Sequence, residues 1–266
     1  MFEILVSPFM QKALIAGMLV SVLSGILSVF IVLRKMSFIG AGISHAAFGG
    51  VAIGFFTGIN PILSALIYTI LIAVGIESVS RTGKLAQDVS IGIFYSVSMA
   101  LGIALISISE SYNVDLFGYL FGNILAITNE EILISLVLFS VLTLLLISFL
   151  KELFFATYNQ ELAQVSGIRV RLLNVFFFIA LAITIVLSIR VVGIILVSAL
   201  LVIPGATARL FARNLFSMIL LSCAAGAGSV FAGLFISYQF DIAPSACIVL
   251  TASALFFIAL FLKKNS

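Results

Sequence analysis

Apolar residues form long uninterrupted runs along this chain, and polar residues gather where the runs end. Nine runs are long enough to cross about 30 Å of hydrocarbon as helices. They cover approximately residues 13–33, 38–58, 61–77, 89–109, 131–150, 172–188, 191–208, 215–237 and 244–262. Runs such as 132–150 are apolar on every face, whereas a membrane barrel strand would alternate apolar and polar positions. The pattern predicts an all-α, polytopic transmembrane helix bundle that forms one domain over residues 1–266.

One further apolar stretch, residues 116–127, is too short to cross the membrane and is interrupted by Gly118 and Gly122. A stretch of this length is typical of a re-entrant or interfacial helix. We therefore expect a short re-entrant helix near 116–128, with eight or ten spans in total as the alternatives to nine.

Basic residues give the bundle an orientation, because lysine and arginine are enriched in cytoplasmic loops. In the nine-span interpretation only Lys12 and Arg190 lie outside. The other eleven of the 13 basic residues lie inside: Arg34, Lys35, Arg81, Lys84, Lys151, Arg169, Arg171, Arg209, Arg213, Lys263 and Lys264. The sequence predicts a multi-pass protein of a bacterial-type inner membrane, with the N-terminus outside and the C-terminus in the cytoplasm.

Composition excludes several other functions. Hydrophobic residues make up 63% of the chain, charged residues 9%, and the mean hydropathy is +1.37, whereas a soluble domain carries about 25% charged residues. The lipid bilayer is therefore the main surroundings. Cys223 and Cys247 form no C-x-x-C pair, and the net charge of +3 is spread over loops, so no nucleic-acid partner is expected. Phosphate-loop and hydrolase motifs are absent from the sequence, so we expect no enzyme.

Small residues recur at every fourth position in three of the predicted spans. Such stripes let helix backbones approach closely in lipid. They serve either packing within the chain or a subunit interface or pathway wall. The three stripes are Gly17, Ser21 and Gly25; Gly42, Ala46, Gly50 and Gly54; and Ala225, Ser229 and Gly233.

The single histidine, His45, lies well inside the second span. Ionisable residues within the membrane are costly and usually face a cavity or a partner, and imidazole is a good ligand for zinc and related metals. We interpret His45 as lining a translocation path; a packing role, with a hydrogen bond to a neighbouring helix, is the alternative. One histidine cannot form a closed metal site. Two copies in a homodimer would form a weak site from which an ion can leave.

Two further segments carry recognisable signals. The longest inside loop, residues 151–171, contains a short predicted helix that Gly167 ends, which suits either docking of a partner or a position on the membrane surface. Pro204 and Gly205 should bend or break the seventh span near its inner end. Pro61 and Pro244 are expected to mark span starts.

Three segments together resemble the permease subunits of bacterial zinc and manganese ATP-binding-cassette importers. The segments are residues 34–37 leading into Ser44-His45-Ala46, the loop from Glu161 to Gly167, and residues 193–200 continuing through Pro204 to Arg209. Residues 115–123 are also similar. The resemblance covers most of the chain, in the same order and spacing, and depends on the combination of segments.

The resemblance implies a homodimeric membrane core, two ATP-binding-cassette ATPase subunits, and an extracytoplasmic metal-binding protein. Any ATP would then be hydrolysed by the separate subunits. It assigns the metal pathway to His45 and Ser44. It also implies a pathway wall or gate formed by Gly49, Asp115, Asn123 and Pro204. The ATPase coupling site would lie in the 151–171 loop and be formed by Glu161, Leu162, Ser166 and Gly167.

The chain departs from the family at Ala41, where the family has an aspartate one turn before the histidine, and at Gly49, where a proline is frequent. Without that carboxylate we expect zinc as the transported divalent metal, ahead of manganese or iron, because zinc accepts nitrogen ligands readily. No stably bound cofactor is expected. The alternatives are a secondary transporter driven by an ion gradient, and a permease for chelated iron or a cobalamin-like ligand.

Overall fold

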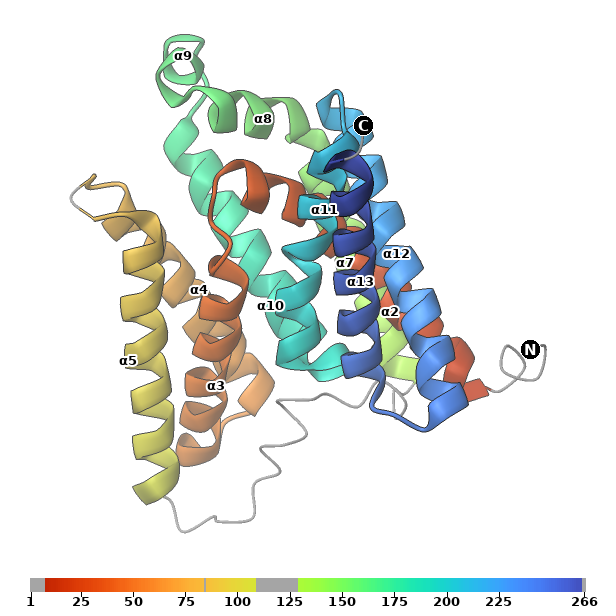
Figure 1. Cartoon of the computed structure of the whole chain (residues 1–266). Coiled ribbons are helices and arrows are strands. Elements are labelled where there is room, and N and C mark those ends of the chain that lie inside the picture. Colours follow the sequence, from red (N-terminus) through yellow and green to blue (C-terminus); the bar gives the residue numbers. More distant parts are fainter. Residues whose placement is uncertain (1–7, 84, 109–128, 265–266) are drawn as a thin grey trace.

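The protein is a bundle of membrane-spanning helices, seen here in a computed structural model that describes residues 8–83, 85–108 and 129–264. Every regular element in these ranges is helical (Figure 1). The helices are α2 (Pro8–Leu33), α3 (Ile39–Thr57), α4 (Pro61–Ser80), α5 (Gln87–Ile108), α7 (Asn129–Ser148), α8 (Leu150–Tyr158), α9 (Gln160–Val165), α10 (Val170–Leu200), α11 (Ile203–Phe211), α12 (Leu215–Phe240) and α13 (Pro244–Lys264).

The number of spans agrees with the sequence pattern. In the described residues, eight helices are long and apolar enough to cross a membrane, and the number is nine if α7 and α8, which are bent by 58°, count as one span. The all-α, polytopic prediction is therefore confirmed. The re-entrant helix expected near 116–128 falls almost wholly outside the described residues.

Helix α10 contains a reversal of the chain at Gly193. This residue has φ 82° and ψ 163°, a conformation that residues with a side chain rarely adopt. A straight helix of 31 residues would be about 46 Å long. Yet Asn174 and Leu201 lie at the same end of the bundle, since Asn174 bonds to Arg34 and Leu201 lies beside Gly40. The two halves of α10 therefore belong to separate spans, Val170–Ile189 and Val192–Phe211, of which the second continues through α11 (Figure 1).

Span starts follow the proline positions. Helix α4 begins at Pro61, and the Asn60 side chain accepts hydrogen bonds from the Ile62 and Leu63 amides, which would otherwise lack partners at the helix start. Helix α13 begins at Pro244. Both predicted starts are confirmed.

The small-residue stripes bring neighbouring helices into backbone contact. A methyl group added at Gly50 would lie 2.6 Å from the Ala65 Cα of α4, and one at Gly233 would lie 2.5 Å from the Ile248 Cα of α13. Gly25 of α2 packs on Cys223 of α12 in the same way. The stripes thus serve packing within the chain, the first of the two roles considered for them.

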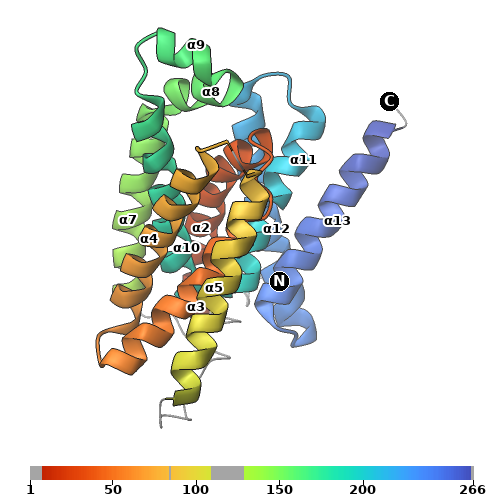
Figure 2. The same cartoon turned by 90° about the vertical axis from the view of Figure 1, so that its left-hand side faces the viewer.

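The two ends of the bundle differ in charge. Helices α8, α9 and the C-terminus lie at one end, called here the α8–α9 end (Figures 1 and 2). Exposed basic residues gather there, at Lys35, Arg81, Lys151, Arg169, Arg171, Arg209, Arg213, Lys263 and Lys264. Lys12, in the first turns of α2, lies at the opposite end.

Candidate functional site

His45 lies in α3, six residues after the helix begins and thus about 9 Å along its axis. Its side chain is half-buried, and its Nδ1 atom is buried without a hydrogen-bond partner. Buried polar atoms are normally paired, and each exception calls for an explanation. The packing alternative supposed a hydrogen bond from the imidazole to a neighbouring helix, and the described residues provide none for Nδ1.

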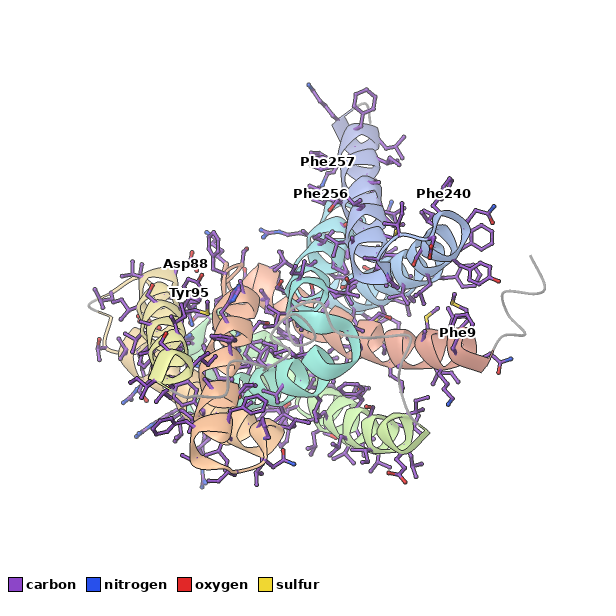
Figure 3. The ribbon with its side chains drawn as sticks, turned by 90° about the horizontal axis from the view of Figure 1, so that it is seen from below. Phe9, Asp88, Tyr95, Phe240, Phe256 and Phe257 are labelled. Atoms are coloured by element: carbon purple, nitrogen blue, oxygen red, sulfur yellow. The ribbon has the colours of Figure 1, made fainter. Side chains whose placement is uncertain are left out.

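Tyr95 of α5 is the aromatic neighbour of His45. The two ring centroids are 5.1 Å apart, with the rings inclined at 63° in an edge-to-face arrangement. Tyr95 is 36% exposed, so its hydroxyl is accessible beside the imidazole side of α3. Asp88, two turns earlier in α5, lies on the same side of that helix and is also exposed (Figure 3). The imidazole of His45 thus packs against the Tyr95 ring of α5, and Asp88 lies about two turns from Tyr95 along α5.

Sequence reasoning did not find Tyr95 or Asp88 as site residues. The available signal was their spacing of seven residues, which places two polar groups on one face of an otherwise apolar helix. That spacing does not say which helix the face meets. The rotation of α5 against α3 is set by packing, in particular by Gly42, which faces the Ile91 side chain.

Ser44 and Gly49, the other pathway candidates in α3, are both buried. The Ser44 hydroxyl has no hydrogen-bond partner in the described part of the chain. A methyl group at Gly49 would lie 2.7 Å from the Ser98 carbonyl of α5. The space beside the small residues of α3 is thus filled by another helix, and Gly49 is where α3 and α5 approach closely.

Pro204 lies at the start of α11, after a break at Leu201–Val202 that separates α11 from α10. The break leaves backbone groups without helical partners. Ser28 of α2 provides hydrogen-bond partners for two of these groups. Its hydroxyl accepts from the Gly205 amide at 2.9 Å and donates to the Val202 carbonyl at 3.3 Å. The predicted helix break is confirmed, and the freed groups are bound by protein. Two other gate candidates, Asp115 and Asn123, lie outside the described residues.

The predicted coupling loop forms a tip of two short helices, α8 and α9. Asn159 caps α9 by accepting from the Leu162 amide at 3.0 Å. Gly167 follows the helix with φ +85° and donates to the Gln164 carbonyl, while Ile168 donates to the Ala163 carbonyl. These bonds form a Schellman motif, as expected for a helix that a glycine ends.

The exposed surface of this tip includes three large apolar or aromatic side chains. Tyr158 is 83% exposed, Leu162 54% and Val165 88%. Glu161 and Ser166 are exposed beside them. Exposed apolar side chains in a rim of polar residues are typical of a protein-binding surface.

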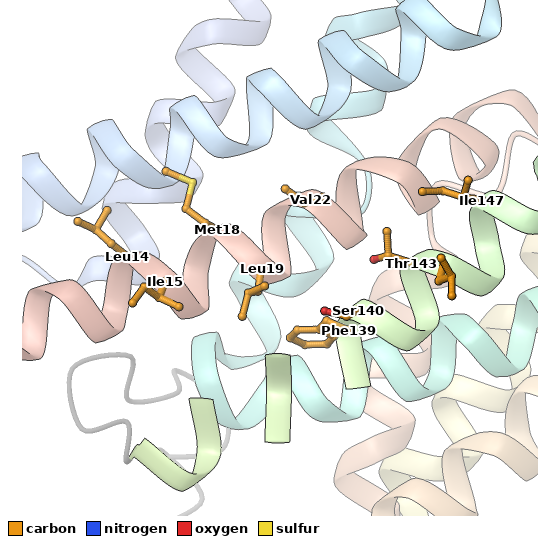
Figure 4. Close-up of a pocket in the computed structure, with 10 residues that line it drawn as sticks. Leu14, Ile15, Met18, Leu19, Val22, Phe139, Ser140, Thr143 and Ile147 are labelled. Carbon is orange, nitrogen blue, oxygen red and sulfur yellow. The ribbon is translucent and has the colours of Figure 1, made fainter. Parts of the chain in front are cut away.

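No closed metal site is present among the described residues, since no three of their His, Cys, Asp or Glu side chains are grouped to hold an ion. A groove of about 640 Å³ lies elsewhere, between α2 and α7 (Figure 4). Its lining is aliphatic and aromatic apart from Ser140 and Thr143. This groove lacks metal ligands and is separate from His45.

Comparison with known proteins gives consistent matches over nearly the whole chain. The family model described as ABC 3 transport family matches residues 6–263. The manganese transport system membrane protein MntC of Listeria innocua is 40% identical over 97% of this chain and 92% of its own length. The manganese import system permease protein ScaB of Streptococcus gordonii is 41% identical with the same coverage. In the solved structure of PsaBC from Streptococcus pneumoniae in complex with Fab, one chain superposes with a TM-score of 0.85 at 37% identity. The match covers 97% of this chain and 93% of that one.

Proposed function

The chain belongs to the ABC 3 transport family, and from that premise we propose that it is the permease of an ATP-binding-cassette importer for manganese. Family membership makes it a transport subunit and not an ATPase, so ATP is hydrolysed by separate subunits. An importer of this class also works with an extracytoplasmic binding protein. The observation that carries the proposal is the unpartnered Nδ1 of His45, held inside a membrane-spanning helix beside Tyr95.

The proposed transported metal is manganese, in place of the zinc expected from the sequence alone. That expectation depended on the loss of a carboxylate at Ala41. Two observations argue the other way. Two relatives that are 40% and 41% identical carry manganese in their names. In α5 the Tyr95 ring lies beside His45, and the Asp88 carboxylate lies on the same side of α5 about two turns nearer the α8–α9 end (Figure 3); manganese favours oxygen ligands.

The proposed path passes the accessible part of His45, beside Tyr95 at the edge of the close contact between α3 and α5. His45 and Ser44 offer a nitrogen and a hydroxyl within the membrane, and Asp88 lies nearer the α8–α9 end. These donors are too few for a closed site, which suits an ion that must leave again. A homodimer would add a second His45 across the shared axis, and we include that homodimer in the proposal.

The α8–α9 end is proposed to face the cytoplasm and to bind the ATPase subunits. The basic residues that gather at this end support the orientation. The exposed Leu162 and Val165 side chains of α9 support the docking role. We propose that the coupling surface also includes Glu161, Ser166 and Gly167, the residues that the resemblance assigns to it.

Reconstitution of the permease with its ATPase subunits and binding protein in liposomes tests the function. We expect ATP-dependent uptake of radioactive manganese, with zinc competing only weakly. Uptake of zinc in preference to manganese would overturn the choice of metal. Uptake driven by an ion gradient, without ATPase, would favour the secondary transporter. Uptake of a chelate but of no free ion would favour the third alternative.

His45→Ala tests the path itself. We expect manganese uptake to fall about tenfold or more, because the only imidazole is lost while insertion in the membrane is retained. Ser96→Ala is the matched control, since Ser96 is an exposed polar residue of α5 next to Tyr95 in sequence. Normal uptake by His45→Ala would remove the histidine from the path.

A further inference from the structure

Arg34 is a partly buried cation at the junction of three helices. It directly follows α2, and its side chain is held by two acceptors: Nε donates to the Thr157 hydroxyl of α8 at 2.9 Å, and Nη1 donates to the Asn174 side-chain carbonyl of α10 at 3.0 Å. The guanidinium also stacks on the Phe177 ring of α10, 4.6 Å from its centroid. One residue therefore ties α2, α8 and α10 together at the α8–α9 end.

Holding helices together through a partly buried charge costs desolvation free energy. Burial lowers the pKa of Arg34 to about 10, so the side chain stays charged at neutral pH. The remaining Nη2 atom is buried without a hydrogen-bond partner in the described residues. Apolar side chains usually stabilise such a position as well as a buried ion or better. The choice of arginine thus points to a role beyond packing.

On one side Arg34 is joined to the helix that carries His45. The backbone turn after α2 is short and hydrogen-bonded. The Arg34 amide donates to the Phe30 carbonyl, the Met36 amide to the Ile31 carbonyl, and the Ile39 amide to the Met36 carbonyl. Met36 is fully buried. Helix α3 begins at Ile39, so a displacement of Arg34 displaces the start of α3.

On the other side Arg34 is joined to the exposed tip. The Thr157 hydroxyl donates its own hydrogen to the Leu153 carbonyl within α8 and accepts from Arg34, which fixes its position. Two residues later Asn159 caps α9. A movement of the α8–α9 tip is therefore passed to Arg34 through a single hydrogen bond.

We infer that Arg34 is the positioning residue that transmits movement of the α8–α9 tip to the start of α3, and so couples ATP hydrolysis to metal release at His45. The inference depends on the proposed function, because it assigns the tip to the ATPase. Asn174 and Phe177 keep the guanidinium aligned on α10. Arg34 touches no metal in this role and acts through the helix that it moves.

The test is the ratio of manganese transported to ATP hydrolysed, measured on the whole complex in liposomes. Arg34→Met keeps an unbranched, though shorter, side chain without the charge or the hydrogen bonds. We expect the complex to assemble and hydrolyse ATP, while the ratio falls about tenfold. Arg34→Lys should recover part of the ratio, since it restores a donor. Arg209→Met is the control: Arg209 is exposed at the same end and contacts the Val32 carbonyl at 3.4 Å.

A wild-type ratio in Arg34→Met would overturn the inference while leaving the proposed function intact. A wild-type complex without ATP-dependent uptake would instead contradict the proposed function. If Arg34→Met does not assemble, Asn174→Leu and Thr157→Val each remove one acceptor and keep the arginine. A lowered ratio in these variants, at unchanged thermal stability, supports the inference. Unchanged ratios in both overturn it.

Discussion

Gly205→Ala is predicted to weaken the contact between α11 and α2. An added methyl group would lie 2.5 Å from the Ser28 hydroxyl oxygen and 2.6 Å from the Ser28 carbonyl oxygen. The second of these atoms belongs to the backbone of a packed helix and cannot rotate away. The helices must therefore separate by several tenths of an ångström, and the hydrogen bond from the Gly205 amide to Ser28 weakens with them.

The magnitude follows from three contributions. Overpacking of this kind costs about 1–3 kcal/mol, and a weakened hydrogen bond about 1 kcal/mol. Replacing glycine by alanine within a helix returns up to about 1 kcal/mol. The net loss in the free energy of unfolding is about 1–4 kcal/mol, which for a chain of this length lowers the melting temperature by roughly 2–16 °C.

Thiol labelling during a thermal ramp measures this change in detergent. The chain has no tryptophan, whereas Cys247 is buried and Cys223 half-buried, so a fluorogenic thiol dye reports unfolding. Gly228→Ala is the matched control, because nothing lies within 4 Å of a methyl group added there. It should melt at or slightly above the wild-type temperature. If the melting temperature of Gly205→Ala equals that of the control, α11 packs on α2 loosely enough to accept the added methyl group.

Three further changes have distinct expected results. Gly167→Ala places a side chain at φ +85° and should cost about 1–2 kcal/mol locally, lowering ATPase stimulation by metal. Gly58→Ala changes a glycine at φ +72° away from the tip and should leave ATPase stimulation by metal unchanged. Equal losses of stimulation in the two variants would contradict a specific coupling role for Gly167. Asn60→Ala removes the α4 cap and should cost about 1 kcal/mol, seen as a lower melting temperature; an unchanged value would show that the cap contributes little. Ala41→Asp restores a carboxylate one turn from His45 and should lower the KM for manganese relative to zinc, and an equal shift for both metals would count against a ligand role.

The elements followed from the sequence because membrane helices are determined locally. Apolar runs, the prolines at 61, 204 and 244, and Gly167 all act through the residues next to them, so helix ends and breaks were predictable. The contacts of the site were not. Tyr95 meets His45, and Arg34 meets Thr157 and Asn174, only after packing fixes how each helix is rotated. The proposed metal differs from the expected one for the same reason: the Ala41 argument counted ligands on one helix and left out the polar side chains of α5.

The close contact of α3 with α4 also limits how the site can move. At Gly50 and Gly54 the two backbones already touch, so α3 cannot slide along α4 without driving a side chain into the neighbouring backbone. The pair can only tilt together, as a lever about the start of α3 at Ile39. His45 lies about 9 Å from that pivot, so a tilt of about 5° moves the imidazole by roughly 0.8 Å. Metal–ligand bonds tolerate only about 0.2 Å. A very small tilt is therefore enough to break a bond between the metal and His45.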